Sequence, residues 1–126
     1  MDRNVEYNRS LAGSFGYALE GIIHAIKNNK NLRIDFVTAL IVIFASIFLH
    51  INSYDKAILG VMILIVISAE MINTSIEEMV NLITQEHRRE AKIAKDVAAG
   101  MVLVAAVGSI IVGVIVFTPY ILELFK

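Results

Sequence analysis

The chain has 126 residues and a formal net charge of −1, and 57% of its residues are apolar, against about 45–50% in an average water-soluble domain. Its mean hydropathy of +0.71 is concentrated in long uncharged runs, which argues against a soluble single-domain enzyme. The lack of cysteine excludes disulfides, thiolate metal sites and a cysteine nucleophile, and the near-neutral charge offers no basic surface for nucleic acid.

The N-terminal third has one apolar face. Apolar residues recur every three or four positions between Leu11 and Ile26, while Glu20 and His24 fall elsewhere on the helical wheel. This pattern predicts an amphipathic helix over about residues 5–28, lying on the inner membrane surface or packed across the cytoplasmic mouth of a helix bundle. The sequence NNKN at 28–31 breaks the pattern and is expected to lead into the first span.

Three apolar blocks follow, and they predict transmembrane helices over about residues 33–51, 55–84 and 95–122. The last block holds 26 residues without a formal charge, Val97 to Leu122, which as a helix would measure about 39 Å against a bilayer core of about 30 Å. Basic residues gather before the first span and between the second and third, so the N-terminus and the 84–96 loop are expected in the cytoplasm. The predicted fold class is an all-α integral membrane protein, a single domain over residues 1–126 with a surface helix followed by three spans.

The second span carries a polar stripe. Glu70, Asn73, Glu77 and Asn81 fall within one sector of about 80° on a helix. Such groups can simply hydrogen-bond to neighbouring helices, but an ionised group inside a membrane costs about 2.5–3.5 kcal/mol, which makes these acids functional candidates. Glu70 lies about two turns deeper than Glu77, where it could accept a proton from a lipid hydroxyl, whereas Glu77 could hold a metal bound to a nucleotide.

A charged loop connects the stripe to the third span. Asp96 is predicted as the N-cap of that span. Lys95 either follows the positive-inside bias or contacts transferring phosphates. The glycine-rich phosphate-binding motifs of soluble nucleotide enzymes are absent from the sequence, so a nucleotide site would have to be built in another way.

Two segments resemble a known family. Residues 70–80 read EMINTSIEEMV and closely resemble the E-x-x-N-[ST]-[AS]-[IL]-E-x-x-V signature of small prokaryotic integral-membrane lipid kinases, the diacylglycerol kinase and undecaprenol kinase family. Residues 94–100 read AKDVAAG and resemble the second motif of that family in the form common in Gram-positive undecaprenol kinases. The resemblance covers nearly the whole chain. It implies a homotrimer in the bacterial plasma membrane, with active sites shared between subunits, MgATP as phosphoryl donor and a membrane lipid alcohol as acceptor.

The resemblance also assigns roles to residues. It implies that Glu70 is the general base and that Glu77 is a metal ligand. Nucleotide contacts are implied for Arg9, Tyr17, Asn73, Glu77, Glu86, His87, Lys95 and Asp96. The chain departs from the family at two positions: Asn29 stands where the family has a second metal-binding acid, and Asn81 stands where it usually has Asp. An amide oxygen such as that of Asn29 can bind Mg²⁺, although it adds no charge.

Four functions remain open at this stage. The form of the second motif favours an undecaprenol kinase, and a diacylglycerol kinase is the alternative within the same class. A small oligomeric proton or cation transporter that uses Glu70 belongs to a different class, although both carboxylates lie in the inner half of the helix. The substitution at Asn29 also raises the possibility of a catalytically inactive relative.

Overall fold

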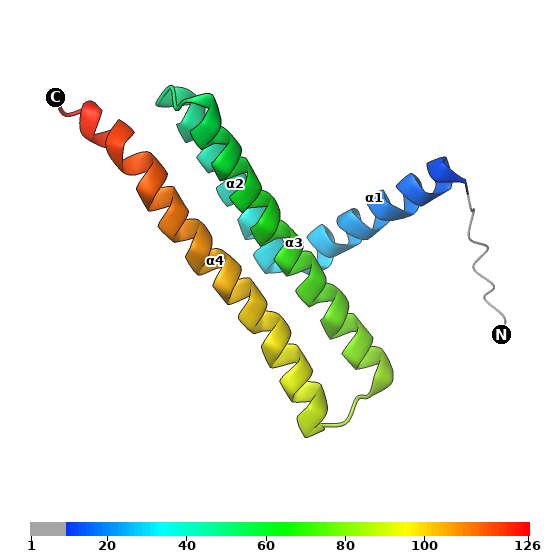
Figure 1. Cartoon of the computed structure of the whole chain (residues 1–126). Coiled ribbons are helices and arrows are strands. Elements are labelled where there is room, and N and C mark those ends of the chain that lie inside the picture. Colours follow the sequence, from blue (N-terminus) through cyan, green and yellow to red (C-terminus); the bar gives the residue numbers. More distant parts are fainter. Residues whose placement is uncertain (1–9) are drawn as a thin grey trace.

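The computed structural model describes residues 10–126, and this part of the chain contains four helices and no strand (Figure 1). The helices are α1 (Leu11–Asn28), α2 (Lys30–Phe48), α3 (Ser53–Ile83) and α4 (Arg89–Glu123). Three of them, α2, α3 and α4, are long and apolar enough to cross a membrane. The predicted all-α membrane fold is therefore confirmed. Arg9, one of the expected nucleotide contacts, lies outside the described residues.

Helix α1 projects away from the three long helices (Figure 1). The Ser10 side chain caps its first turn by accepting a hydrogen bond from the Gly13 N–H at 3.0 Å. Leu11 and Phe15, on the predicted apolar face, are 89% and 75% exposed. This face is not covered by the rest of the described chain, as expected of a helix that packs against a membrane surface.

A single residue, Asn29, joins α1 to α2. Its backbone N–H donates to the Ala25 carbonyl and so ends α1, while its side-chain oxygen accepts from the first N–H groups of α2. Arg33 reinforces the junction because its guanidinium donates to the carbonyls of Ile26 and Lys27, at 3.0 and 2.7 Å. The start of α2 is thereby fixed against the end of α1 and next to α3, which both helices contact.

The opposite end of the bundle is closed by the α2–α3 turn. His50 adopts a left-handed conformation with φ 52°, and the N–H of Ile51 donates to the Ser46 carbonyl at 3.0 Å, which is the Schellman arrangement of a helix end. Buried Ile51 packs with Leu59 and Val116 and so ties the turn to α3 and α4. Helix α4 packs mainly against α3, so these two helices form the main body of the bundle.

The start of the third span differs from expectation. Helix α4 begins at Arg89, six residues before the predicted span, and its N-cap residue is Arg88. The prediction that Asp96 caps the third span is therefore wrong, because Asp96 lies inside the helix. The uncharged sequence begins only at Val97. Helix α4 starts earlier and includes the charged residues 89–96 as its first two turns.

Candidate active site

The most buried polar residue on α3 is Glu70, at 3% exposure. Its Oε2 accepts a hydrogen bond of 3.1 Å from the side-chain Nδ2 of Asn29. The same Nδ2 donates to Thr74 Oγ1 at 2.8 Å, and the Thr74 hydroxyl donates to the Glu70 backbone carbonyl at 2.9 Å. The α1–α2 junction is thus attached directly to the carboxylate that the sequence singles out.

Asn73 lies about one turn, and Glu77 about two turns, closer to the α3–α4 loop than Glu70. Asn73 is 8% exposed and its Nδ2 donates to Glu77 Oε1 at 3.4 Å, a long hydrogen bond. The Asn73 Oδ1 is buried and accepts no hydrogen bond from the described residues. A buried acceptor without a donor is costly, so this oxygen suits a cation or an added donor. Within residues 10–126 no group of three or more His, Cys, Asp or Glu side chains could hold a metal.

The stripe ends at Asn81, whose Oδ1 accepts a hydrogen bond of 2.7 Å from Lys95 Nζ and so links α3 to α4. Lys95 lines an open hollow of about 720 Å³ formed by the end of α3, the connecting loop and the start of α4. Four of the expected nucleotide contacts line this hollow: Glu86, His87, Lys95 and Asp96. Lys92, Arg88 and Arg89 also line it, which gives the hollow an excess of basic side chains.

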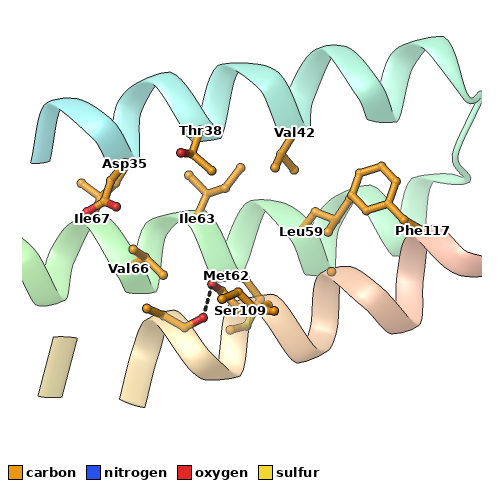
Figure 2. Close-up of a pocket in the computed structure, with 14 residues that line it drawn as sticks. Asp35, Thr38, Val42, Leu59, Met62, Ile63, Val66, Ile67, Ser109 and Phe117 are labelled. Carbon is orange, nitrogen blue, oxygen red and sulfur yellow. Dashed lines mark hydrogen bonds between the residues drawn. The ribbon is translucent and has the colours of Figure 1, made fainter. Parts of the chain in front are cut away.

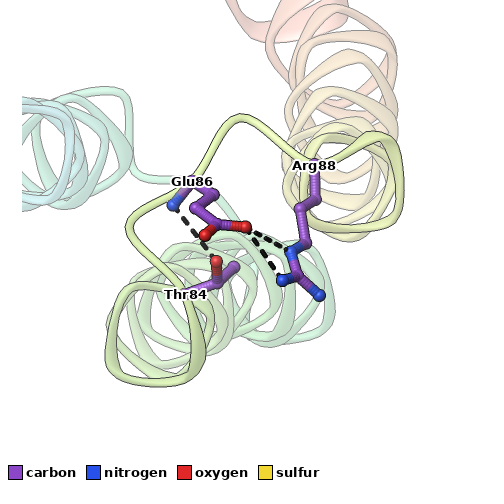
Figure 3. Close-up of polar contacts among 3 residues, drawn as sticks. All are labelled: Thr84, Glu86 and Arg88. Carbon is purple, nitrogen blue, oxygen red and sulfur yellow. Dashed lines mark hydrogen bonds and ion pairs between the residues drawn. The ribbon is translucent and has the colours of Figure 1, made fainter.

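Both acids that line this hollow, Glu86 and Asp96, form ion pairs with neighbouring basic residues. Glu86 Oε2 binds the Arg88 guanidinium at 2.8 and 2.9 Å, and the Glu86 N–H donates to Thr84 Oγ1 at 3.1 Å (Figure 3). These contacts shape the loop between α3 and α4. Asp96 Oδ2 accepts from Lys92 Nζ one turn earlier on α4. Lys95, by contrast, binds only the neutral amide of Asn81 among the described contacts, so its charge is not offset there.

The remaining expected contact, Tyr17, lies half-buried on α1 and does not line this hollow. The structure therefore brings the expected residues together in two groups: Asn29, Glu70, Asn73 and Glu77 at the α2–α3 contact, and Glu86, His87, Lys95 and Asp96 at the loop.

Sequence analysis missed Asp35, in the second turn of α2. Its Oδ2 is buried and accepts no hydrogen bond from the described residues. Asp35 lies at one end of a cavity of about 240 Å³ between α2, α3 and α4, with Ile67 beside it and Leu59 and Phe117 at the far end (Figure 2). An acid inside the first predicted span was the available signal, because such acids are rare in membrane helices.

Comparison with known proteins identifies the family. The sequence profile described as prokaryotic diacylglycerol kinase matches residues 16–117, which include both groups of expected site residues and Tyr17 but not Arg9. The chain belongs to the prokaryotic diacylglycerol kinase family. This confirms the resemblance found in the sequence and the expected class of enzyme, a lipid kinase.

The relatives of this chain are named for two different lipids, diacylglycerol and undecaprenol. The chain is 39% identical to a diacylglycerol kinase of Synechocystis sp. over 116 residues, which are 91% of this chain and 66% of that protein. It is 36% identical to the undecaprenol kinase of Bacillus subtilis over 118 residues, 94% of this chain and 95% of that protein. The diacylglycerol kinase of Escherichia coli is 26% identical over 96 residues, 76% of this chain and 79% of that protein. The chain thus spans slightly less than two thirds of the Synechocystis relative but nearly all of the Bacillus one.

Proposed function

We propose that the chain transfers the γ-phosphate of ATP to the hydroxyl of a membrane lipid alcohol, with undecaprenol as the first candidate. The observation that carries this proposal is the position of Glu70. It is a buried carboxylate in a helix able to cross a membrane, held by Asn29, on a polar stripe that leads to the basic hollow at the loop. Lipid hydroxyls and water-soluble nucleotides occupy different depths of a membrane, and this stripe connects the two depths.

Glu70 is the general base in this proposal. Its carboxylate accepts the proton of the lipid hydroxyl while the hydroxyl oxygen bonds to the γ-phosphorus, and the bond to the β–γ bridging oxygen breaks to release ADP. Lys95 contacts the phosphates, since its ammonium lines the hollow and has no carboxylate partner within residues 10–126. Phosphoryl transfer depends mainly on positioning and charge neutralisation, so this small set of residues is sufficient.

Mg²⁺ is the proposed cofactor, and the residues fit it. Mg²⁺ is bound in enzymes by one or two carboxylates together with substrate phosphates and water. Here the Glu77 carboxylate and the Asn73 Oδ1, a buried oxygen that accepts no hydrogen bond from the described residues, lie one turn apart. These two side chains would hold the ion, which when bound neutralises charge on the phosphates.

The lipid chain has a suitable place in the cavity between α2, α3 and α4. Its walls are largely apolar and include Val42, Leu59 and Val66, and Asp35 lies at one end (Figure 2). We propose that this space holds a segment of the lipid chain next to its hydroxyl end. The preference for undecaprenol comes from the form of the second motif at 94–100, and the name of the Synechocystis relative supports diacylglycerol as the alternative.

The proposed assembly is a homotrimer in the bacterial plasma membrane, with the N-terminus and the α3–α4 loop in the cytoplasm. Large apolar side chains on the spans are exposed in the single chain, among them Phe44 at 70% and Val104 at 74%. Lipid or neighbouring subunits must cover such surfaces. The basic residues of the loop hollow support the cytoplasmic placement of that end.

The test is phosphoryl transfer from γ-labelled ATP by the purified chain in mixed micelles, with undecaprenol and diacylglycerol offered separately. We expect Glu70→Gln to lower kcat at least about 100-fold, because a positioned general base contributes about 10²–10⁴-fold. The matched control is Glu78→Gln, which makes the same change at an exposed position of α3 and should leave the rate within about twofold. Phosphorylation of neither lipid, or full activity of Glu70→Gln, would refute the proposed function.

A further inference from the structure

The side chain of Asn29 has no free hydrogen-bonding capacity. Its Oδ1 accepts from the N–H groups of Asn31 and Leu32, at 2.8 and 3.2 Å, and so caps α2. Its Nδ2 donates to Glu70 Oε2 at 3.1 Å and to Thr74 Oγ1 at 2.8 Å. A primary amide has two acceptor lone pairs and two donor hydrogens, and all four are engaged here. Asn29 could bind a cation only by giving up the α2 cap.

A carboxylate at position 29 would behave differently. It could keep the cap, because Asp also accepts from the N–H groups of a first helical turn. It would have no hydrogen to donate, however, and would place a second negative charge about as close to Glu70 as Nδ2 lies now, 3.1 Å. Two carboxylates at that distance cannot both be ionised without a cation between them. The neutral amide of Asn29 donates to Glu70 instead, so only one of the two side chains carries a negative charge.

We propose that Asn29 is a positioning residue that fixes the Glu70 carboxylate through Oε2, and that the chain therefore needs no cation between positions 29 and 70. The hydrogen bond from Asn29 engages Oε2 of Glu70, which leaves Oε1 as the oxygen that would accept the proton of the lipid hydroxyl. Cation binding is then confined to Glu77 and Asn73, one to two turns nearer the loop. This inference rests on the proposed role of Glu70, and it treats Asn29 as a functional replacement for an acid and not as a sign of lost activity.

The junction between α1 and α2 fixes the position of the Asn29 side chain that donates to Glu70. The backbone of Asn29 ends α1 through a hydrogen bond of 2.8 Å to the Ala25 carbonyl, and Arg33 covers the neighbouring carbonyls of that helix. Thr74 holds the second amide hydrogen and is itself bonded to the Glu70 backbone. The donor to Glu70 is therefore fixed on both the α1–α2 side and the α3 side.

Two variants separate this role from the capping role. Asn29→Ser keeps an oxygen suited to capping α2 but is too short to reach Glu70, and Asn29→Asp keeps the cap and adds the charge. Asn28→Ser and Asn28→Asp are matched controls one residue earlier, because the exposed Asn28 side chain bonds, among the described residues, only to His24 of its own helix. All are assayed as full-length protein in mixed micelles for kcat, for KM of MgATP and, by electron paramagnetic resonance of free Mn²⁺, for Mn²⁺ binding without nucleotide.

We expect Asn29→Ser to lower kcat roughly 10- to 100-fold, the scale of a misplaced catalytic group, with the KM of MgATP and Mn²⁺ binding unchanged. Asn29→Asp should bind Mn²⁺ more tightly than wild type, and neither Asn28 variant should differ from wild type. A loss of Mn²⁺ binding in Asn29→Ser would show that Asn29 is a ligand and would overturn the inference, as would an unchanged kcat in that variant. A wild-type chain that phosphorylates neither lipid would instead refute the proposed function, so the two failures are distinguishable.

Discussion

Removal of the Tyr120 hydroxyl tests how the end of the bundle far from Glu70 is held together. This hydroxyl donates to Asp55 Oδ2 at 2.8 Å and accepts from the side-chain and backbone nitrogens of Asn52 at 2.7 and 3.2 Å, so one oxygen connects α4 to the start of α3. A net hydrogen bond contributes about 0.5–1.5 kcal/mol, and one to a charged group contributes about 1.5–3 kcal/mol. Asn52 is exposed to water, which replaces part of this loss. We therefore expect Tyr120→Phe to lower the free energy of unfolding by about 1–3 kcal/mol.

The assay is unfolding by sodium dodecyl sulfate in mixed micelles, followed by far-ultraviolet circular dichroism. Tyr54→Phe is the matched control, because Tyr54 lies between the two partners of Tyr120 but is 85% exposed, and its removal should change stability by no more than about 0.5 kcal/mol. Kinase activity under native conditions should not change in either variant, since Asn52 and Asp55 lie at the opposite end of α3 from Glu70. Equal stabilities of the two variants would refute the reasoning.

Three further variants probe the proposed site. Lys95→Met should raise the KM of MgATP about tenfold or more, because a charge-assisted contact to phosphate is lost, whereas Lys126→Met at the C-terminus should have no effect; a titration of initial rate against MgATP decides. Glu77→Gln should raise the Mg²⁺ concentration needed for half-maximal rate while Glu78→Gln leaves it unchanged, and equal metal titrations of the two would argue against Glu77 as a ligand. Gly113→Leu should raise the KM of the lipid but not of MgATP, since an added Cβ meets no atom within 4 Å there and the side chain would enter the lipid cavity.

Periodicity and charge were enough to predict the class of fold. Uncharged runs as long as Val97 to Leu122 have few alternatives to a membrane helix, and the 3.6-residue repeat places Glu70 and Asn73 on one face, where both are indeed buried. The ends of the helices were harder to predict from the sequence. The start of α4 at Arg89 could not be read from hydropathy, because a helix that leaves the membrane keeps its backbone hydrogen bonds while its side chains become charged.

Contacts between distant segments could not be predicted from the sequence. The bond from Asn29 to Glu70 joins residues 41 positions apart, and it depends on how α1, α2 and α3 meet. The motif pattern showed only that an acid was missing at position 29, which leaves a weak metal ligand and lost activity as equally good readings. Asp35 was visible in the sequence as an acid inside a predicted span, but its place at one end of the cavity depends on how α2, α3 and α4 pack.

Opposite charges lie at the two ends of the polar stripe on α3: the Glu70 carboxylate at one end, and the Lys95 ammonium bound to Asn81 at the other. The Glu70 carboxylate accepts its hydrogen bond from the neutral amide of Asn29, so its negative charge is not cancelled by that partner. At the loop, Lys95 is held by the neutral Asn81, so its positive charge is likewise not cancelled. An ion pair at either place would have satisfied the side chains equally well but would have removed the charge that the chemistry requires. In the proposed mechanism, the Glu70 carboxylate accepts the proton of the lipid hydroxyl and the Lys95 ammonium holds the phosphates of the nucleotide, so the two substrates would meet along the polar stripe that separates these two charges.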